Sequence, residues 1–172
     1  MTLCLRNRQR KCPIDLRLLR RILRFALERS FNASDYELCF HFVPAPEMAS
    51  VNEKFLDHIG PTDVITFNHG GAGRAEQTGS LRYSRLETCA TTSRLHGEIF
   101  ICPEVAVAQA RKFRTSWPQE IVRYCVHGLL HLRGYDDVRA ADRRRMKREE
   151  DRVVNDLSRQ FAVARLSRAR PK

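Results

Sequence analysis

The 172-residue chain has 42% apolar residues, which is typical of a globular protein and long enough for one domain with a single core. No run approaches the roughly 20 apolar residues that span a bilayer, and the N-terminus lacks a signal-peptide pattern, so a membrane protein and a secreted protein are not expected. The net charge of +11 comes mainly from residues 6–29 and 143–172. It favours a polyanionic partner, with nucleic acid before a membrane surface, although arginines on exposed helices can also act only as a solubilising surface.

The N-terminal half predicts alternating helices and strands. Apolar side chains recur at helical spacing over residues 14–29, with arginines on the other face. A short run rich in aromatic and apolar residues predicts a strand at 36–43, followed by a short helix at 46–56 and a second strand at 64–67. Residues 68–94 are expected to form a long surface loop. One more strand is expected, either near residue 3 or at 81–83 within that loop.

The C-terminal half predicts a third strand at 97–102 and a helix at 103–114 that Pro103 opens. Residues 116–119 have the form of a capping box, so a long apolar helix should begin there and end near Gly134, a typical C-terminal glycine. A last helix is expected at 139–157. The sequence therefore predicts an α/β (α+β) fold, a single compact domain over residues 1–157 with a small mixed sheet packed with helices. Residues 158–172 should form a basic, frayed tail.

The six cysteines are scattered and include no CxxC pair. Several lie inside apolar runs, where a free cysteine behaves as a small hydrophobic residue. We therefore expect a reduced, cytoplasmic protein without structural disulfides.

The segment HGLLHLRGYDD, residues 127–137, predicts a metal site at the end of the long helix. His127 and His131 are four residues apart and lie on one helical face, with Cα atoms about 6 Å apart. Both imidazoles can then converge on one Zn²⁺, and Gly134 permits the turn that brings Asp137 to a third position. Three protein ligands leave the fourth position open, as in catalytic zinc sites.

Two other interpretations of this segment stay open. The histidines could be core residues that hydrogen-bond to the backbone, although a buried histidine pair without compensation is costly. Asp137 could instead cap the following helix, with Asp136 as the third ligand.

The same spacing occurs in zinc peptidases, but their chemistry is not expected here. Those enzymes use the glutamate after the first histidine as a general base. That position is Gly128 in this chain, and glycine has no group that accepts a proton. Other histidines could assist proton transfer, but their spacing selects none of them, so no general base is assigned: His41, His58, His69 and His96.

At this segment the sequence resembles the YbeY family of bacterial rRNA maturation factors, whose motif is H-G-x-L-H-L-x-G-Y-D-H. Residues 61–67, PTDVITF, resemble the family's P-T-D-V-L-S-F, and residues 97–102, GEIFIC, resemble its G-D-I-x-I strand. The resemblance implies a zinc-dependent endoribonuclease specific for single-stranded RNA. It implies roles in 16S rRNA 3′-end maturation and ribosome quality control in the cytoplasm, with the small ribosomal subunit as a partner.

Two positions depart from the family pattern. The third ligand would be Asp137 rather than histidine, which adds a negative charge at the metal. Leu56 stands where the family usually has arginine, and leucine cannot bind phosphate. A non-catalytic, zinc-stabilised RNA- or ribosome-binding assembly factor is therefore the rival interpretation, and another zinc hydrolase is a third.

Overall fold

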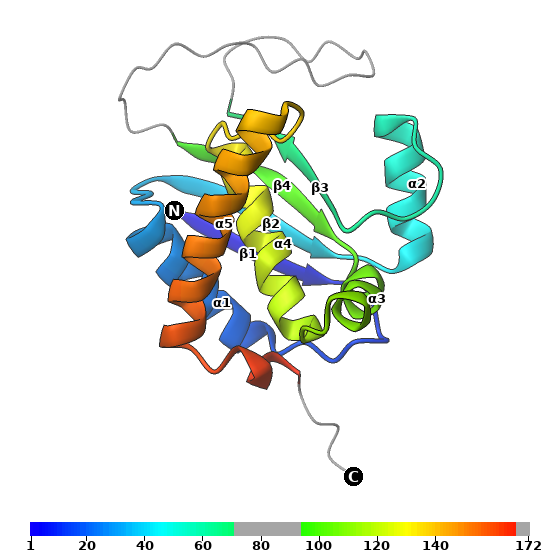
Figure 1. The fold of residues 1–172 in the computed structure, drawn as a ribbon, viewed down its shortest axis with the longest axis horizontal. Helices are drawn as coiled ribbons and strands as arrows, with labels where there is room; N and C mark the ends of the chain where they lie inside the picture. Colours follow the sequence, from blue (N-terminus) through cyan, green and yellow to red (C-terminus); the bar gives the residue numbers. More distant parts are fainter. Residues whose placement is uncertain (71–93, 168–172) are drawn as a thin grey trace.

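A four-stranded mixed sheet forms the centre of the computed structural model, which describes residues 1–70 and 94–167 (Figure 1). The strand order is β1-β2-β4-β3, where β1 and β2 are parallel, β2 and β4 are parallel, and β3 runs antiparallel to β4. The strands are β1 Thr2–Asn7, β2 Tyr36–Phe42, β3 Val64–Asn68 and β4 Leu95–Ile101.

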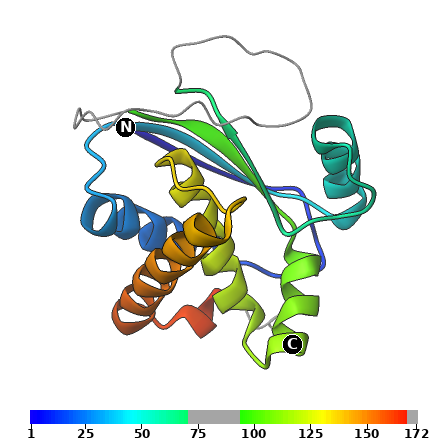
Figure 2. The same cartoon turned by 45° about the horizontal axis from the view of Figure 1, so that its top comes forward.

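The helices pack mainly on one face of this sheet. Figure 2 shows α1, α4 and α5 stacked on that face, while α2 stands apart beside β3. The helices are α1 Leu16–Phe25, α2 Ala45–Leu56, α3 Pro103–Phe113, α4 Trp117–Leu132 and α5 Ala140–Gln160. A π-helical turn, η1 Ala26–Ser30, extends α1, and a 3₁₀ turn, η2 Val163–Leu166, follows α5. None of the helices that the structure describes is long and apolar enough to cross a membrane.

Successive side chains of each strand point to opposite faces of the sheet. Leu38, Phe40 and Ile99 are buried against the helices. The residues between them, such as Glu37 and Glu98, lie on the outer face and are at least partly exposed. A second, smaller apolar cluster fills the space between α2 and the sheet, around Val43, Met48, Ile65 and Cys102. These observations confirm the predicted single α/β domain with a small mixed sheet.

Two glycines bring the C-terminal half of α4 close to the sheet. A Cβ atom at Gly128 would lie 2.8 Å from Cγ2 of Ile99 on β4. A Cβ atom at Gly97 on β4 would collide with the carbonyl oxygen of Phe67 and lie 2.7 Å from Cδ2 of Leu132. Since larger residues would separate the two elements, the glycines hold this part of α4 against β3 and β4.

The end of α4 confirms the role predicted for Gly134. Its φ angle is +88°, and its N–H donates to the His131 carbonyl at 2.9 Å. The Tyr135 N–H donates to the Leu130 carbonyl at 3.0 Å. These two bonds form a Schellman motif, which ends the helix and turns the chain back.

Most predicted elements are present within one or two residues of their expected bounds, and the extra strand is β1. The helix predicted over 14–29 differs, because regular α-helix ends at Phe25 and the chain continues as η1. Ile14 instead forms a bridge with Ser167. The strand considered at 81–83 and most of the predicted loop lie outside the described residues.

Two predictions near the helix ends are wrong. Ser116 is the N-cap of α4, but its side chain makes no capping hydrogen bond, so there is no capping box. The tail expected to fray from Ser158 is ordered as far as Ser167, since α5 continues to Gln160 and Leu166 is fully buried. The Leu166 carbonyl accepts the Asp15 N–H at 2.9 Å, which ties this segment to the start of α1.

Within the described residues, five cysteines are free thiols: Cys4, Cys12, Cys39, Cys102 and Cys125. Cys89 lies outside those residues.

Candidate metal centre

The two histidines of α4 face each other. Nε2 of His127 lies 3.0 Å from Nε2 of His131, and the rings meet edge to face with centroids 4.7 Å apart. Two Nε2 atoms each bonded to one zinc at about 2.0–2.1 Å in a tetrahedral arrangement would be separated by about 3.3 Å. The observed separation is therefore close to the one that a shared ion requires.

Asp137 supplies the third donor of this group. Its Oδ2 lies 3.9 Å from Nε2 of His127, and the ligand atoms of His127, His131 and Asp137 all lie within 4.8 Å of one another. Oδ1 of Asp136 instead accepts the backbone N–H groups of Asp137 at 2.7 Å and Val138 at 3.1 Å. Asp136 thus stabilises the turn, and the geometry favours Asp137 as the carboxylate that could reach a metal.

The outer nitrogens of both rings have partners that fix their orientation. Nδ1 of His131 lies 3.1 Å from the Tyr135 carbonyl, which can only accept, so Nδ1 carries the hydrogen. Nδ1 of His127 lies 3.0 Å from Oε2 of Glu150 and donates to that carboxylate. Both rings then direct Nε2 into the space between them. A carboxylate or carbonyl behind each histidine is the usual outer arrangement of a metal site.

Glu150 is the centre of a charged network behind the group. It is only 5% exposed, and its Oε1 accepts hydrogen bonds from Arg123 at 2.6 Å and Lys147 at 2.9 Å. Burial alone would raise the pKa of Glu150, but the hydrogen bonds from His127, Lys147 and Arg123 outweigh it and hold that pKa at about 2. Glu150 is therefore ionised at neutral pH and accepts the Nδ1–H of His127 as a carboxylate, which fixes the orientation of the ring.

His131 is also held in the form that binds metals. Burial lowers its pKa, and the neighbouring His127 lowers it further. The neutral imidazole therefore predominates at neutral pH, as metal ligation requires. The donor set of two imidazoles and one carboxylate suits zinc. Because these three donor atoms converge within 4.8 Å of one another, the residues fit a bound metal ion.

Basic side chains surround the turn that carries Asp137. Nε of Arg143 donates to the Asp137 carbonyl at 2.9 Å and Nη2 donates to the Val138 carbonyl at 3.1 Å, which holds the turn. The Arg145 guanidinium lies 5.4 Å from the centre of the Tyr135 ring. Four further exposed arginines, before and along α5, have side chains with no ion-pair or hydrogen-bond partner among the described residues: Arg133, Arg139, Arg144 and Arg148.

The other histidines lie elsewhere. His41 and His96 project from β2 and β4 on the outer face of the sheet, opposite α4; His41 lies 3.3 Å from Glu98. His69 packs against His96, with ring centroids 5.4 Å apart, and His58 is exposed after α2. None of them belongs to the metal group, so the structure selects no general base. Gly128 faces Ile99 on the sheet, so no base can come from that position either.

Sequence reasoning missed Glu150 and Arg123. The missed signal is the register of α5, whose buried stripe consists of Met146, Glu150, Val153, Val154 and Leu157. A glutamate at a core-facing position of an amphipathic helix needs a buried partner, which here is the His127 ring together with Arg123.

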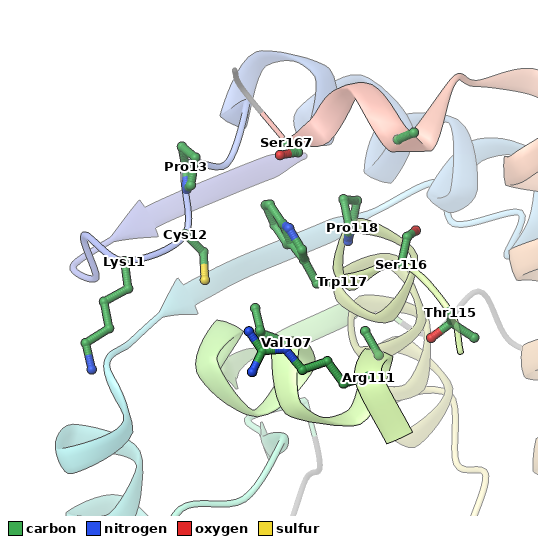
Figure 3. Close-up of a pocket in the computed structure, with 12 residues that line it drawn as sticks. Lys11, Cys12, Pro13, Val107, Arg111, Thr115, Ser116, Trp117, Pro118 and Ser167 are labelled. Carbon is green, nitrogen blue, oxygen red and sulfur yellow. The ribbon is translucent and has the colours of Figure 1, made fainter. Parts of the chain in front are cut away.

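A hollow of about 620 Å³ lies at the other end of α4 (Figure 3). Side chains from α3, α4 and the segments before α1 and after η2 line it, including Lys11, Arg111, Trp117 and Ser167. It is separate from the metal group, which lies near the C-terminal end of α4.

Fold and site together define a single-domain α/β protein with a candidate metal centre. The sequence model of the family described as "Endoribonuclease YbeY" matches residues 5–158. The chain is 36% identical over 109 residues to an Endoribonuclease YbeY from Chlorobium luteolum, covering 63% of this chain and 65% of the relative. It is 36% identical over 135 residues to one from Corynebacterium efficiens, covering 78% and 64%. It is 30% identical over 142 residues to one from a Nocardioides species, covering 83% and 89%.

The chain therefore belongs to the YbeY endoribonuclease family. It spans slightly less than two thirds of the length of the Chlorobium and Corynebacterium relatives. The solution structure of TM1509 from Thermotoga maritima superimposes with a TM-score of 0.60 at 20% identity, covering 99% of this chain and 98% of that one. At that identity the likeness supports the fold alone.

Proposed function

We propose that this chain is a zinc-dependent endoribonuclease that cuts single-stranded RNA, with the ion held by His127, His131 and Asp137. The observation that carries the proposal is the convergence of these three donors within 4.8 Å, in a chain whose relatives are named endoribonucleases. When bound, zinc would supply charge to polarise a phosphoryl oxygen or to activate water.

The protein's own residues orient this site. Glu150 and the Tyr135 carbonyl hold the two imidazoles with Nε2 pointing inward, and Arg143 holds the turn that carries Asp137. The exposed arginines before and along α5 attract the phosphate backbone of RNA. An aspartate as third ligand adds a negative charge, so the ion would polarise phosphate less strongly than with three histidines.

The proposed biological role is maturation of the 16S rRNA 3′ end and quality control of ribosomes, with the small ribosomal subunit as a partner, in the cytoplasm. The family, the motif HGLLHLRGYD and the net charge of +11 support this role.

Metal analysis combined with RNA cleavage tests the proposal. The purified protein should contain one zinc ion per chain, and His131→Ala should lose both the ion and the cleavage of single-stranded RNA. His131→Ala should weaken zinc affinity by more than the roughly 100-fold that is lost when a hydrogen-bond partner behind a metal ligand is removed. His58→Ala is the matched control, because His58 is exposed and outside the metal group. A protein without stoichiometric metal, or a His131→Ala variant that cleaves normally, would refute the proposal.

One observation favours the rival function of a non-catalytic RNA- or ribosome-binding factor. Leu56 is partly buried against the apolar cluster under α2, so its side chain contributes to packing and offers no contact for a phosphate. An Asp137→Ala variant that keeps its fold and its RNA affinity but loses cleavage would argue against this rival. A panel of RNA, peptide and ester substrates would distinguish the endoribonuclease and the non-catalytic factor from another kind of zinc hydrolase.

A further inference from the structure

Two cysteine thiols lie side by side on the outer face of the sheet. Cys4 on β1 and Cys39 on β2 are direct partners in the parallel register, and both are partly exposed. The Cys4 side chain lies close enough to Cys39 to influence its ionisation. Neither residue belongs to the apolar core, so packing alone does not account for the pair.

The surroundings make the two thiols chemically different. The Arg6 guanidinium, two residues along β1 on the same face, lies beside Cys4. Burial and the neighbouring Cys4 side chain raise the pKa of Cys39 to about 12. The raised pKa disfavours the Cys39 thiolate, which is the form that oxidation requires. Cys4 is therefore the sulfur placed to react first, and Cys39 is the neighbouring thiol placed to react second.

We propose that Cys4 and Cys39 form a reversible disulfide when the protein meets a peroxide. The Cys4 thiolate attacks one oxygen of hydrogen peroxide, the O–O bond breaks, and hydroxide leaves, which gives a sulfenic acid on Cys4. The Cys39 sulfur then attacks the Cys4 sulfur, the S–O bond breaks, and the Cys39 proton leaves with the hydroxyl group as water. In sum, two thiols are oxidised, one peroxide is reduced and two water molecules form.

The backbone geometry permits this bond. Paired residues on neighbouring strands lie about 4.8 Å apart, which is within the roughly 4.4–6.8 Å between Cα atoms joined by disulfides. β1 is the edge strand of the sheet within the described part of the chain, so it can adjust to bring the sulfurs together. The bond would fasten this edge strand to β2. Because the metal group lies with α4 on the opposite face, oxidation here should leave metal binding unchanged.

Peptide mapping under non-reducing conditions tests the proposal on the full chain. After treatment with hydrogen peroxide and alkylation of remaining thiols, trypsin should release residues 1–6 linked to residues 30–54, with the loss of two hydrogens. Dithiothreitol should separate the two peptides again. The oxidised protein should unfold at a higher temperature than the reduced protein, because the cross-link restricts the unfolded chain.

Conservative variants serve as controls. Cys39→Ser should abolish the linked peptide and allow Cys4 to oxidise further to sulfinic acid. Cys12→Ser should leave the linked peptide unchanged, because Cys12 is buried away from this pair. Peroxide treatment that converts Cys4 to sulfinic acid in the unmodified chain while Cys39 stays free would overturn the proposal. Failure to find zinc or cleavage would contradict only the proposed function.

Discussion

The two ends of α4 differ in how their polar groups are arranged. Near the C-terminal end, two imidazoles and a carboxylate meet within 4.8 Å, and the outer nitrogen of each ring has a partner. At the N-terminal end there is a hollow of about 620 Å³, and Figure 3 shows its polar side chains spread around it. Lys11 pairs with Glu104 at 2.6 Å, and the Thr115 hydroxyl donates to Glu120 at 2.5 Å.

Volume alone therefore does not identify a site in this protein. The hollow has room for a ligand, but Lys11 and Thr115 are satisfied by partners of their own. At the metal group the donors converge, and Glu150 and the Tyr135 carbonyl hold the two imidazoles from behind. Convergence of oriented donors is the physical requirement for binding an ion.

Beyond the loss of a ligand itself, the largest effect is expected from loss of the charge behind His127. Glu150→Gln should weaken zinc affinity by roughly 10-fold or more, because a neutral amide is a poorer acceptor for the Nδ1–H of His127 and orients the ring less firmly. Competition with a chromophoric chelator measures the affinity. Asp151→Asn is the matched control: Asp151 shares Arg123 and Lys147 with Glu150 and has no hydrogen bond to His127. Equal losses in both variants would show that the network acts only on the fold.

The next effect concerns the close packing at the metal-bearing end. Gly128→Ala should lower the free energy of unfolding by about 1–3 kcal/mol, because the new methyl would overlap with Ile99. Denaturant unfolding measures the change. The double variant with Ile99→Ala should lose less unfolding free energy than the sum of the losses in the two single variants. Simple additivity would mean that Gly128 and Ile99 do not limit the approach of α4 to the sheet.

A smaller effect is expected on RNA affinity. Replacing Arg144 and Arg148 by alanine should weaken binding of single-stranded RNA and reduce the salt dependence by a slope of roughly 0.7 for each phosphate that is no longer neutralised. The control replaces Arg111 and Lys112, two exposed basic residues of α3 at the hollow end, and should leave the slope unchanged. Fluorescence anisotropy over a salt series gives both values. Equal losses of RNA affinity in the two variants would indicate a general attraction between the basic protein and RNA, rather than an RNA-binding surface near the metal group.

The smallest effect is expected at the start of α4. Ser116→Ala should change the free energy of unfolding by less than about 0.5 kcal/mol, because the hydroxyl makes no capping bond. Asp15→Ala should cost about 1 kcal/mol, since Oδ1 of Asp15 accepts the Arg17 and Leu18 N–H groups at the start of α1. Similar costs at the two sites would mean that Ser116 does contribute to capping in solution.

Local patterns predicted most of the fold. The strands β2 and β3 and the helices α2, α3 and α4 follow hydrophobic periodicity and turn residues closely. The prediction failed where long-range contacts decide the outcome. Leu166 is ordered because it is buried in the main core, although the basic sequence around it is typical of a tail. The π-helical turn after Phe25 likewise could not be predicted from the apolar spacing, which continues through it.

The sequence by itself determined the His127 and His131 pair and the Gly134 turn, because helical geometry and a left-handed glycine act over a few residues. Only the tertiary structure decided that Asp137 rather than Asp136 comes within reach of both histidines, and that Glu150 supports His127 from 23 residues further along the chain. It also placed Cys4 next to Cys39, since pairing between strands joins residues that no local pattern connects.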